Sequence, residues 1–600
     1  MSFSTTGMSK YNNISAKLTT EWNLKQLYKS PEDPQIERDL IVAEKAYLAF
    51  AKKYKTNSKY MTSEASLLSA LRGYEKILDI PISKTYTYLH LAQDLDSKNE
   101  KVRAKINLIS QRLQKIENNI LFFEINLSKI ALKHQKLFLS SKKLPKYNYL
   151  LKKTFETGKY VLTELEEKIL SLKSLPSHKL WTDAFDKVEN KQTVRHKGKD
   201  IPVSEAVSII RNLKTQTERK KLHDAVMDRY YEISEMAESE LNAIVTDKKI
   251  NDELRGYSKA YDSTIMRYEN DKKSVLNLIK TITDNFNIAH RFYKVKAKML
   301  KLKSLNYSDR AVGVGKTKRK ILFDESCDVL QKLFISIDPR FGDILKSYLT
   351  NGQIDAYPKV GKRGGAYCSS HHKVPTFVLL NHTNTFESLS TFAHEMGHAI
   401  HSEFSRSQPV IYENYSIATA EVASTLFESF FFYDQFEKFS KEEKIVALHN
   451  KIQDDVATIF RQIACFNFEL EMHETIREKG NMTREELAVC MNKHMKSYLG
   501  NKFKLNEMDG YNFVGWSHIR YFFYVYSYGF GQLASKALYM KYKEDKKYIE
   551  KIKQFLSLGG SMSPEDIFKS IGVDVIKPDF FKKGIESIEE DIKMLEKLVK

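Results

Sequence analysis

The chain has 600 residues, 42% hydrophobic and 29% charged, which is the composition of a soluble globular protein with ample chain for a large core. No apolar run reaches the roughly 18 residues of a membrane helix, so we expect no stable membrane association. The net charge of +20 comes from lysines spread along the chain, without a basic arm, zinc finger or RNA-binding motif, so nucleic acid is not an expected partner.

The first third of the chain has a helical pattern. Apolar residues recur at three- and four-residue steps between Lys and Glu in the stretches 35–57, 98–137 and 150–174. Proline is rare, at 12 residues. We therefore predict an N-terminal helical region, residues 1–195, that ends at a turn-rich connector near residues 194–202 and precedes a second region, residues 196–600.

One part of the second region has a strand-like pattern. Residues 361–368 are rich in glycine, and residues 374–380 form a short β-branched and apolar run. Glycine permits another backbone to approach closely. We predict a small sheet here, although an ordinary turn accounts for the glycines equally well.

Residues 391–401 contain the pattern His394-Glu395-Met-Gly-His398. On a helix, positions i and i+4 share one face, so the two imidazoles can bind one Zn²⁺ while the glutamate reaches a water molecule at the metal. Apolar residues at helical spacing predict a buried helix, with Thr385 or Asn384 as its N-cap. A chance match is the alternative, and a third ligand would argue against it.

The third ligand must come from farther along the chain. Position 404 is Phe, so the longer motif with a third histidine after a glycine turn is absent. A second apolar helix is predicted from residue 417, and it contains Glu421 between apolar neighbours. An unpaired buried carboxylate is costly, so zinc is a natural partner for it. A salt-bridged or partly exposed Glu421 is the alternative, and Glu428 is the rival ligand.

A late segment, residues 518–531, is unusually rich in tyrosine. Peptide hydrolysis at zinc places negative charge on the carbonyl oxygen, and phenol or imidazole donors aimed at that oxygen lower the barrier. Tyr521, Tyr524 and Tyr528 stand at i, i+3 and i+7, so packing in an aromatic core is the alternative interpretation.

Several of these segments together resemble a known family. The zinc motif is followed by His401, by Asn414-Tyr-Ser-Ile and by Ala420-Glu-Val-Ala-Ser. This order is similar to the oligoendopeptidase F branch of the thimet oligopeptidase-like (M3) zinc metallopeptidases, and shorter matches near residues 22, 162 and 254 extend the resemblance over nearly the whole chain. The linker near residues 405–408 is one residue shorter than usual, and residues 514–517 depart from the usual Ile-Pro.

The resemblance implies roles for individual residues. Glu421 would be the third zinc ligand after His394 and His398. His518 and Tyr526 would donate to the oxyanion, with Tyr524 as second choice.

For the glycine-rich segment, the resemblance implies an edge strand that holds the peptide as an added strand, and Gly365 and Ala366 are the positions expected at that edge.

The implied protein is a mainly α, two-lobed zinc endopeptidase with a deep substrate channel and a small sheet beside the zinc helix, and residues 196–600 are its catalytic region. It would cut internal bonds of short peptides with one Zn²⁺ per chain, and Glu395 would take a proton from the attacking water and pass it to the leaving amine. A dipeptidyl carboxypeptidase of the same family is one alternative. A non-catalytic peptide-binding protein is another, disfavoured because three ligands and a base are all present.

The remaining histidines and the cysteines are expected to be ordinary. We leave four nearby histidines out of the metal site, namely His371, His372, His382 and His401. The four cysteines lie far apart, which argues for reduced thiols and a cytoplasmic protein.

Overall fold

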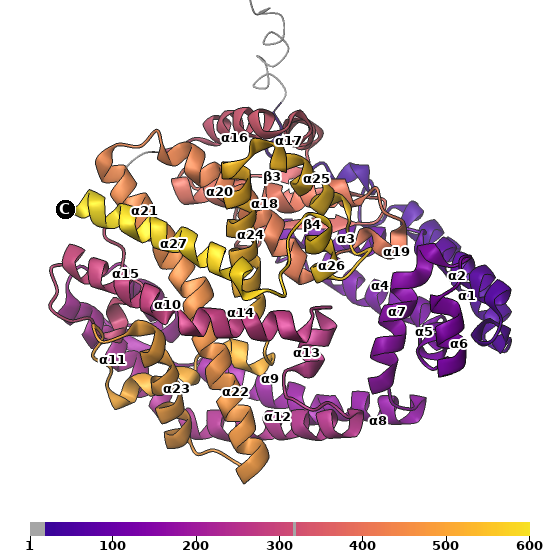
Figure 1. Ribbon diagram of the computed structural model, residues 1–600, viewed down its shortest axis with the longest axis horizontal. Coiled ribbons are helices and arrows are strands. Elements are labelled where there is room, and N and C mark those ends of the chain that lie inside the picture. Colours follow the sequence, from indigo (N-terminus) through magenta and orange to yellow (C-terminus); the bar gives the residue numbers. More distant parts are fainter. Residues whose placement is uncertain (1–17, 316–319) are drawn as a thin grey trace, which may run out of the picture. The chain divides into compact units, whose positions relative to one another are not determined.

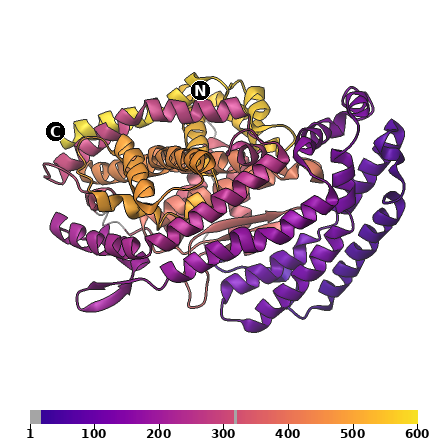
Figure 2. The ribbon, with the colours of Figure 1, turned by 90° about the horizontal axis from the view of Figure 1, so that it is seen from below.

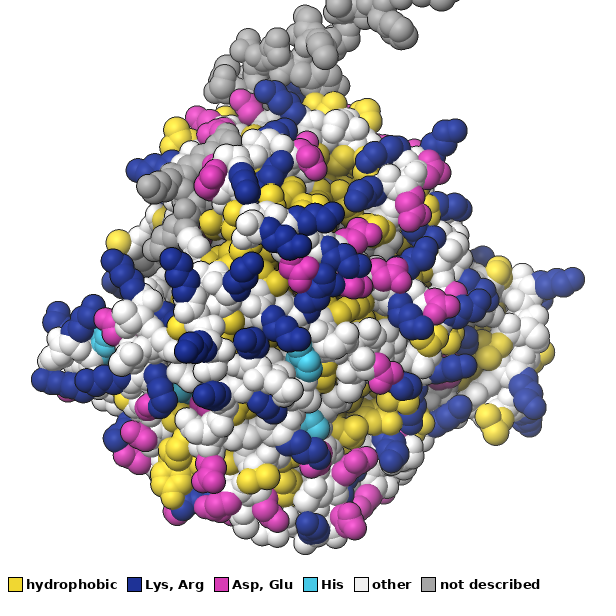
Figure 3. Space-filling view, turned by 60° about the vertical axis from the view of Figure 1, so that its left-hand side comes forward, with side chains coloured by type: hydrophobic (Ala, Val, Ile, Leu, Met, Phe, Trp, Pro, Cys, Tyr) yellow, Lys and Arg dark blue, Asp and Glu magenta, His cyan; other side chains and the backbone are white. Residues whose placement is uncertain are grey.

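The computed structural model describes residues 18–315 and 320–600, and nearly all of its elements are helices (Figure 1). This confirms the mainly α prediction. The first 17 residues of the predicted N-terminal region lie outside the described residues. No helix in the described part is long and apolar enough to cross a bilayer. Lys and Arg side chains are scattered among Asp and Glu on the face shown in Figure 3.

The chain forms two compact units, each built from three separate segments. Of the described residues, unit 1 contains 18–161, 320–435 and 541–571, and unit 2 contains 162–315, 436–540 and 572–600. The segments of the two units alternate along the chain. The predicted division at residue 195 separates an N-terminal from a C-terminal region of the sequence, and it stays a prediction. The predicted connector at that point is a β-hairpin, β1 (Thr193–His196) with β2 (Lys199–Pro202), whose two turn residues Lys197 and Gly198 both have positive φ.

Unit 1 begins with a series of helices, of which α1 matches the predicted stretch 35–57 (Figure 2). The predicted stretch 98–137 is divided among three helices, α4 to α6. A single core joins these helices to the sheet, because the indole of Trp22 donates to the carbonyl of Val378 at 2.9 Å and packs edge-on against Phe377. The helices of unit 1 are α1 (Pro34–Tyr54), α2 (Glu64–Leu78), α3 (Ser83–Leu95), α4 (Glu100–Asn118), α5 (Leu121–Ser128), α6 (Leu132–Leu139), α7 (Asn148–Thr157), α16 (Phe323–Ile337), α17 (Pro339–Asn351), α18 (Phe386–Ser405), α19 (Val410–Glu413), α20 (Ile417–Phe436), α25 (Ile549–Ser557) and α26 (Pro564–Ser570).

The predicted small sheet is present in unit 1. Its three strands are β3 (Ile354–Asp355), β4 (Tyr367–His371) and β5 (Val374–Leu379), in the order β3-β5-β4. β5 pairs in parallel with β3 and antiparallel with β4, which is therefore an edge strand of this sheet. Helix α18 packs against β4 and β5, so the sheet lies beside the helix that carries the His-Glu-x-x-His motif.

Unit 2 is helical apart from the hairpin. Capping boxes mark several helix starts, as at Thr215 before α11 and Thr483 before α23, where a threonine hydroxyl and a glutamate three residues later satisfy the first backbone amides. Its helices are α8 (Glu164–Ser174), α9 (Leu180–Glu189), α10 (Val203–Ile210), α11 (Gln216–Glu232), α12 (Ser234–Arg255), α13 (Asp262–Arg267), α14 (Lys272–Asp284), α15 (Phe286–Met299), α21 (Lys441–Asp455), α22 (Arg461–Lys479), α23 (Arg484–Leu499), most of α24 (Tyr526–Glu544) and α27 (Pro578–Val599).

Candidate metal centre

Helix α18 carries both histidines of the motif on one face. Its N-cap is Thr385, whose hydroxyl accepts a hydrogen bond from the amide of Ser388 at 3.2 Å. Asn384, the other predicted cap, lies one residue before it with a φ of 60°. The cap fixes where the helix begins, and His394 and His398 then follow one turn apart.

Helix α20 crosses α18 at Gly397, between the two histidines. A Cβ on Gly397 would lie 2.7 Å from the Cα of Ser424 and 3.1 Å from the carbonyl oxygen of Ala423. Any larger residue would push the helices apart. The close crossing places Glu421, one turn before Ser424, opposite the two imidazoles.

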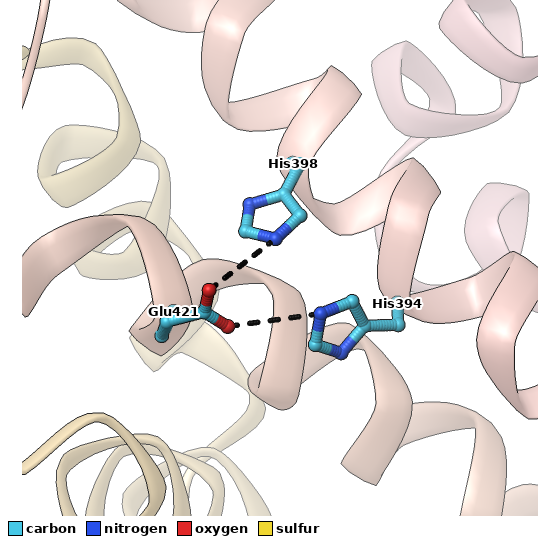
Figure 4. Close-up of side chains that lie close together, drawn as sticks. All are labelled: His394, His398 and Glu421. Atoms are coloured by element: carbon cyan, nitrogen blue, oxygen red, sulfur yellow. Dashed lines mark ion pairs between the residues drawn. The ribbon is translucent and has the colours of Figure 1, made fainter. Parts of the chain in front are cut away.

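The three predicted ligands meet between these helices. The Nε2 of His394 lies 3.7 Å from one carboxylate oxygen of Glu421, and the Nε2 of His398 lies 3.9 Å from the other (Figure 4). The donor atoms all lie within 4.8 Å of one another. Because a tetrahedral zinc ion with bonds of about 2.0–2.1 Å holds its ligand atoms roughly 3.4 Å apart, the type and the spacing of these donors fit a metal ion.

Glu428, the rival ligand, lies on the other side of His394. Its carboxylate accepts from the Nδ1 of His394 at 3.4 Å and from the hydroxyl of Ser390 at 3.0 Å. A hydrogen bond to Nδ1 fixes the tautomer of a metal-binding histidine and directs its Nε2 toward the metal. The sequence did not predict this contact, in which Glu428 orients the ring of His394.

Burial and neighbouring charges shift the pKa values of the side chains at this site. Burial lowers the pKa of His394, but the hydrogen bond to Glu428 and the charges of Glu428, Glu395 and Glu421 raise it more, to about 9. Burial and the nearby His394 lower the pKa of His398 to about 3. Burial, opposed by His394 and reinforced by Glu421 and Glu428, raises the pKa of Glu395 to about 7. The site is thus one in which excess negative charge favours a bound cation.

A cavity of about 490 Å³ opens beside these groups within unit 1. Glu395 lines it, is 6% exposed, and is not one of the three grouped donors, as expected for a base. Of the two predicted edge positions, Ala366 lines the cavity directly before β4. Gly365 has a φ of 81°, and its carbonyl accepts a hydrogen bond from the side-chain Nδ2 of Asn381 at 2.7 Å.

The neighbouring histidines have other partners. The ring of His401 stacks on Tyr415 at 3.7 Å with an interplanar angle of 8°. His372 hydrogen-bonds Asp79 at 2.9 Å, and His382 hydrogen-bonds the hydroxyl of Ser326 at 3.1 Å. His371 lines the cavity, but the grouping of donors among the described residues does not include it.

The predicted oxyanion donors lie in unit 2. His518 stacks on Tyr524 at 5.4 Å, and the hydroxyl of Tyr528 lies 3.5 Å from that of Tyr524; all three side chains are partly exposed. Tyr526 is fully buried, and its hydroxyl donates to the side chain of Asn270 at 3.0 Å. The structure therefore groups the side chain of His518 with those of Tyr524 and Tyr528, whereas the side chain of Tyr526 is buried in the core.

Known proteins resemble this chain over most of its length. The sequence model of Peptidase family M3 matches residues 209–587. The chain is 26% identical to oligopeptidase PepF of Bacillus subtilis, covering 97% of this chain and 88% of that protein. It is 28% identical to an oligoendopeptidase F homolog of Borreliella burgdorferi, covering 86% and 90%. A solved structure from Chlamydophila abortus superimposes with a TM-score of 0.84 at 25% identity, covering 96% of this chain and 98% of that one. The chain therefore belongs to peptidase family M3, as its motifs indicated, and is a metallopeptidase of the oligoendopeptidase F type.

Proposed function

We propose that this protein is a zinc-dependent endopeptidase that cuts internal bonds of short peptides. The observation that supports it most is the meeting of His394, His398 and Glu421 beside a cavity that Glu395 also lines. Two imidazoles and one carboxylate are the donor set of catalytic zinc, which leaves one position open. When bound, zinc polarises a carbonyl and lowers the pKa of water.

In the proposed reaction, individual side chains of the protein have separate roles. Glu395 takes a proton from the attacking water and returns it to the leaving amine. Glu428 accepts a hydrogen bond from the Nδ1 of His394 and thereby fixes the orientation of that ring. Ala366 and the β4 edge offer backbone groups to an extended peptide, as the resemblance implies.

His518 stays in the proposal as a donor to the oxyanion, on the strength of the family resemblance. For the phenol donor, the burial of Tyr526 and its bond to Asn270 support Tyr524 in its place. The four cysteines are free, which agrees with a cytoplasmic location.

Metal analysis and product analysis together test the proposal. Purified protein should carry one zinc per chain, and His394→Ala should lose it. The control is His290→Ala, at a half-buried histidine of unit 2 whose Nε2 lies 2.7 Å from the carbonyl of Ser497. Zinc retained in His394→Ala would place the metal elsewhere.

Mass analysis of products from a pool of peptides should show internal cleavage. Release of C-terminal dipeptides alone would instead assign a dipeptidyl carboxypeptidase. A short flexible peptide should also be cut much faster than the same sequence within a stable folded domain, and equal cleavage of both would contradict the restriction to short peptides.

A further inference from the structure

Unit 2 contains a second cavity, of about 220 Å³, lined by residues of unit 2 alone. Its lining includes the buried apolar side chains of Val226, Met227 and Trp516. It also includes Arg211, Arg310 and Arg461, and no Asp or Glu is among the described lining residues. We call this cavity the arginine pocket.

Two of the three arginines stack on aromatic rings and have a buried Nε without a hydrogen-bond acceptor. The guanidinium of Arg461 lies 4.1 Å from the ring centroid of Trp516, and that of Arg310 lies 5.0 Å from the ring of Tyr307. The Nε atoms of Arg310 and Arg461 and the hydroxyl of Ser308 are buried and make no hydrogen bond within the described chain. A buried donor without an acceptor is costly, so three such donors around one cavity indicate a ligand that accepts hydrogen bonds.

The nearby carboxylates of Asp309 and Asp509 have other hydrogen-bond partners. Asp309 accepts from the buried Arg219 at 2.7 Å, and Asp509 contacts His223 at 2.7 Å. Partial burial and the positive charges of Arg310 and Arg461 hold the pKa of Arg211 below its usual range, with Asp454 opposing them. Positive charge therefore predominates in the pocket, which favours an anionic ligand.

The size and the lining of the pocket restrict the ligand further. A cavity of this volume is smaller than sites for drug-sized ligands and suits a single amino-acid residue. A lining that combines apolar side chains with three arginines matches a residue that has both an apolar side chain and a carboxylate. In a peptide, only the C-terminal residue has both.

We propose that the arginine pocket binds the C-terminal residue of a peptide, with its α-carboxylate on the arginines and its side chain on the apolar lining residues. The proposal rests on peptides being the ligands of this enzyme. It adds that a free C-terminus within reach of the pocket contributes to affinity. Charge-assisted hydrogen bonds of this kind predict that amidation weakens binding roughly 10- to 100-fold.

The test uses N-acetyl-leucine and N-acetyl-leucinamide as probes, titrated into the full-length protein and into His394→Ala. Trp516, one of three tryptophans in the chain, lines the pocket and reports binding by fluorescence. The acid should bind roughly 10-fold or more tightly than the amide in both proteins. The signal should disappear in Trp516→Phe. Because no hydrolysis is needed, loss of peptidase activity would not affect this result.

Two arginine variants test whether the α-carboxylate of the probe binds to the arginines. Arg211→Gln removes an exposed arginine at the rim, and Arg461→Lys keeps the charge without the planar fork. Both should bring the ratio of acid to amide affinity toward 1, whereas Arg195→Gln, at an exposed arginine paired with Asp200 at 3.2 Å, should leave it unchanged. Equal affinity for acid and amide would overturn the proposal, as would an unchanged ratio in both pocket variants. Equally tight binding of N-acetyl-glutamic acid α-amide would overturn the C-terminal assignment.

Discussion

Gly397 and Ser424 lie so close that a methyl group on the glycine would stand 2.7 Å from the Cα of the serine. Helices α18 and α20 therefore cross at the one position between the two histidines that has no side chain. The metal centre depends on this contact, because the third donor comes from α20.

We expect Gly397→Ala to force α20 away from α18, to lower the thermal stability and to reduce zinc per chain well below one. Elemental analysis and thermal unfolding measure the two effects. Gly73→Ala on α2 is the matched control, since its new Cβ would make only ordinary contacts at 3.5 Å and should stabilise the helix by about 0.5–1 kcal/mol. Full zinc and normal stability in Gly397→Ala would contradict this account of the crossing.

Glu395→Gln should keep the zinc and lose nearly all hydrolysis. The amide preserves the shape of the side chain but cannot accept the proton of the attacking water. Zinc content and kcat are measured on the same preparation. A zinc-loaded variant that turns over normally would remove Glu395 from the role of base.

Glu428→Gln should weaken zinc binding by about 10- to 100-fold while the ligand set stays intact, because the variant loses the carboxylate that directs His394. Competition with a chelator gives the affinity. Glu387→Gln, an exposed glutamate in the first turn of α18, is the control and should bind zinc normally. An unchanged affinity in Glu428→Gln would reduce its contact with His394 to a surface ion pair.

Tyr524→Phe and Tyr526→Phe should have different effects. Loss of an oxyanion donor costs about 10²–10³ in kcat, so Tyr524→Phe should lower kcat with KM little changed. Tyr526→Phe loses its hydrogen bond to Asn270 and should cost about 1 kcal/mol of stability with kcat near normal. The reverse pattern would restore Tyr526 as the donor.

Glu469 should make stability depend on pH. Burial raises its pKa well above the usual value, against the opposing effects of the Phe523 amide, which donates to it at 2.7 Å, and of Lys248. The folded state therefore holds the proton more tightly than the unfolded state, and its stability falls as pH rises above about 4.5 toward the folded pKa. Glu469→Gln should remove this dependence and be more stable than wild type at pH 7. Denaturant unfolding from pH 5 to 8 measures it, with Glu478→Gln as the exposed control on the same helix. An unchanged pH profile would mean that Glu469 is ionised in the fold.

Local patterns in the sequence were enough to predict the parts of this protein that depend on near neighbours. The spacing of His394 and His398 and the apolar period of α18 act within one or two turns, so they can be read without a fold, whereas the sequence left the N-cap open between Thr385 and Asn384. The same holds for the small sheet before α18, and the family followed from several such motifs in order. Exact helix ends were less predictable, as the division of residues 98–137 into three helices shows.

Only the tertiary structure decided which distant side chains meet. Both Glu421 and Glu428 were candidates as ligands. The crossing of α20 at Gly397 places Glu421 near the Nε2 atoms of both histidines, and it places Glu428 near the Nδ1 of His394. Likewise, Tyr524 and Tyr526 look alike in the sequence, but their environments in unit 2 differ because one packs in the core. These distinctions depend on helix packing between segments far apart in the chain, and no local pattern encodes them.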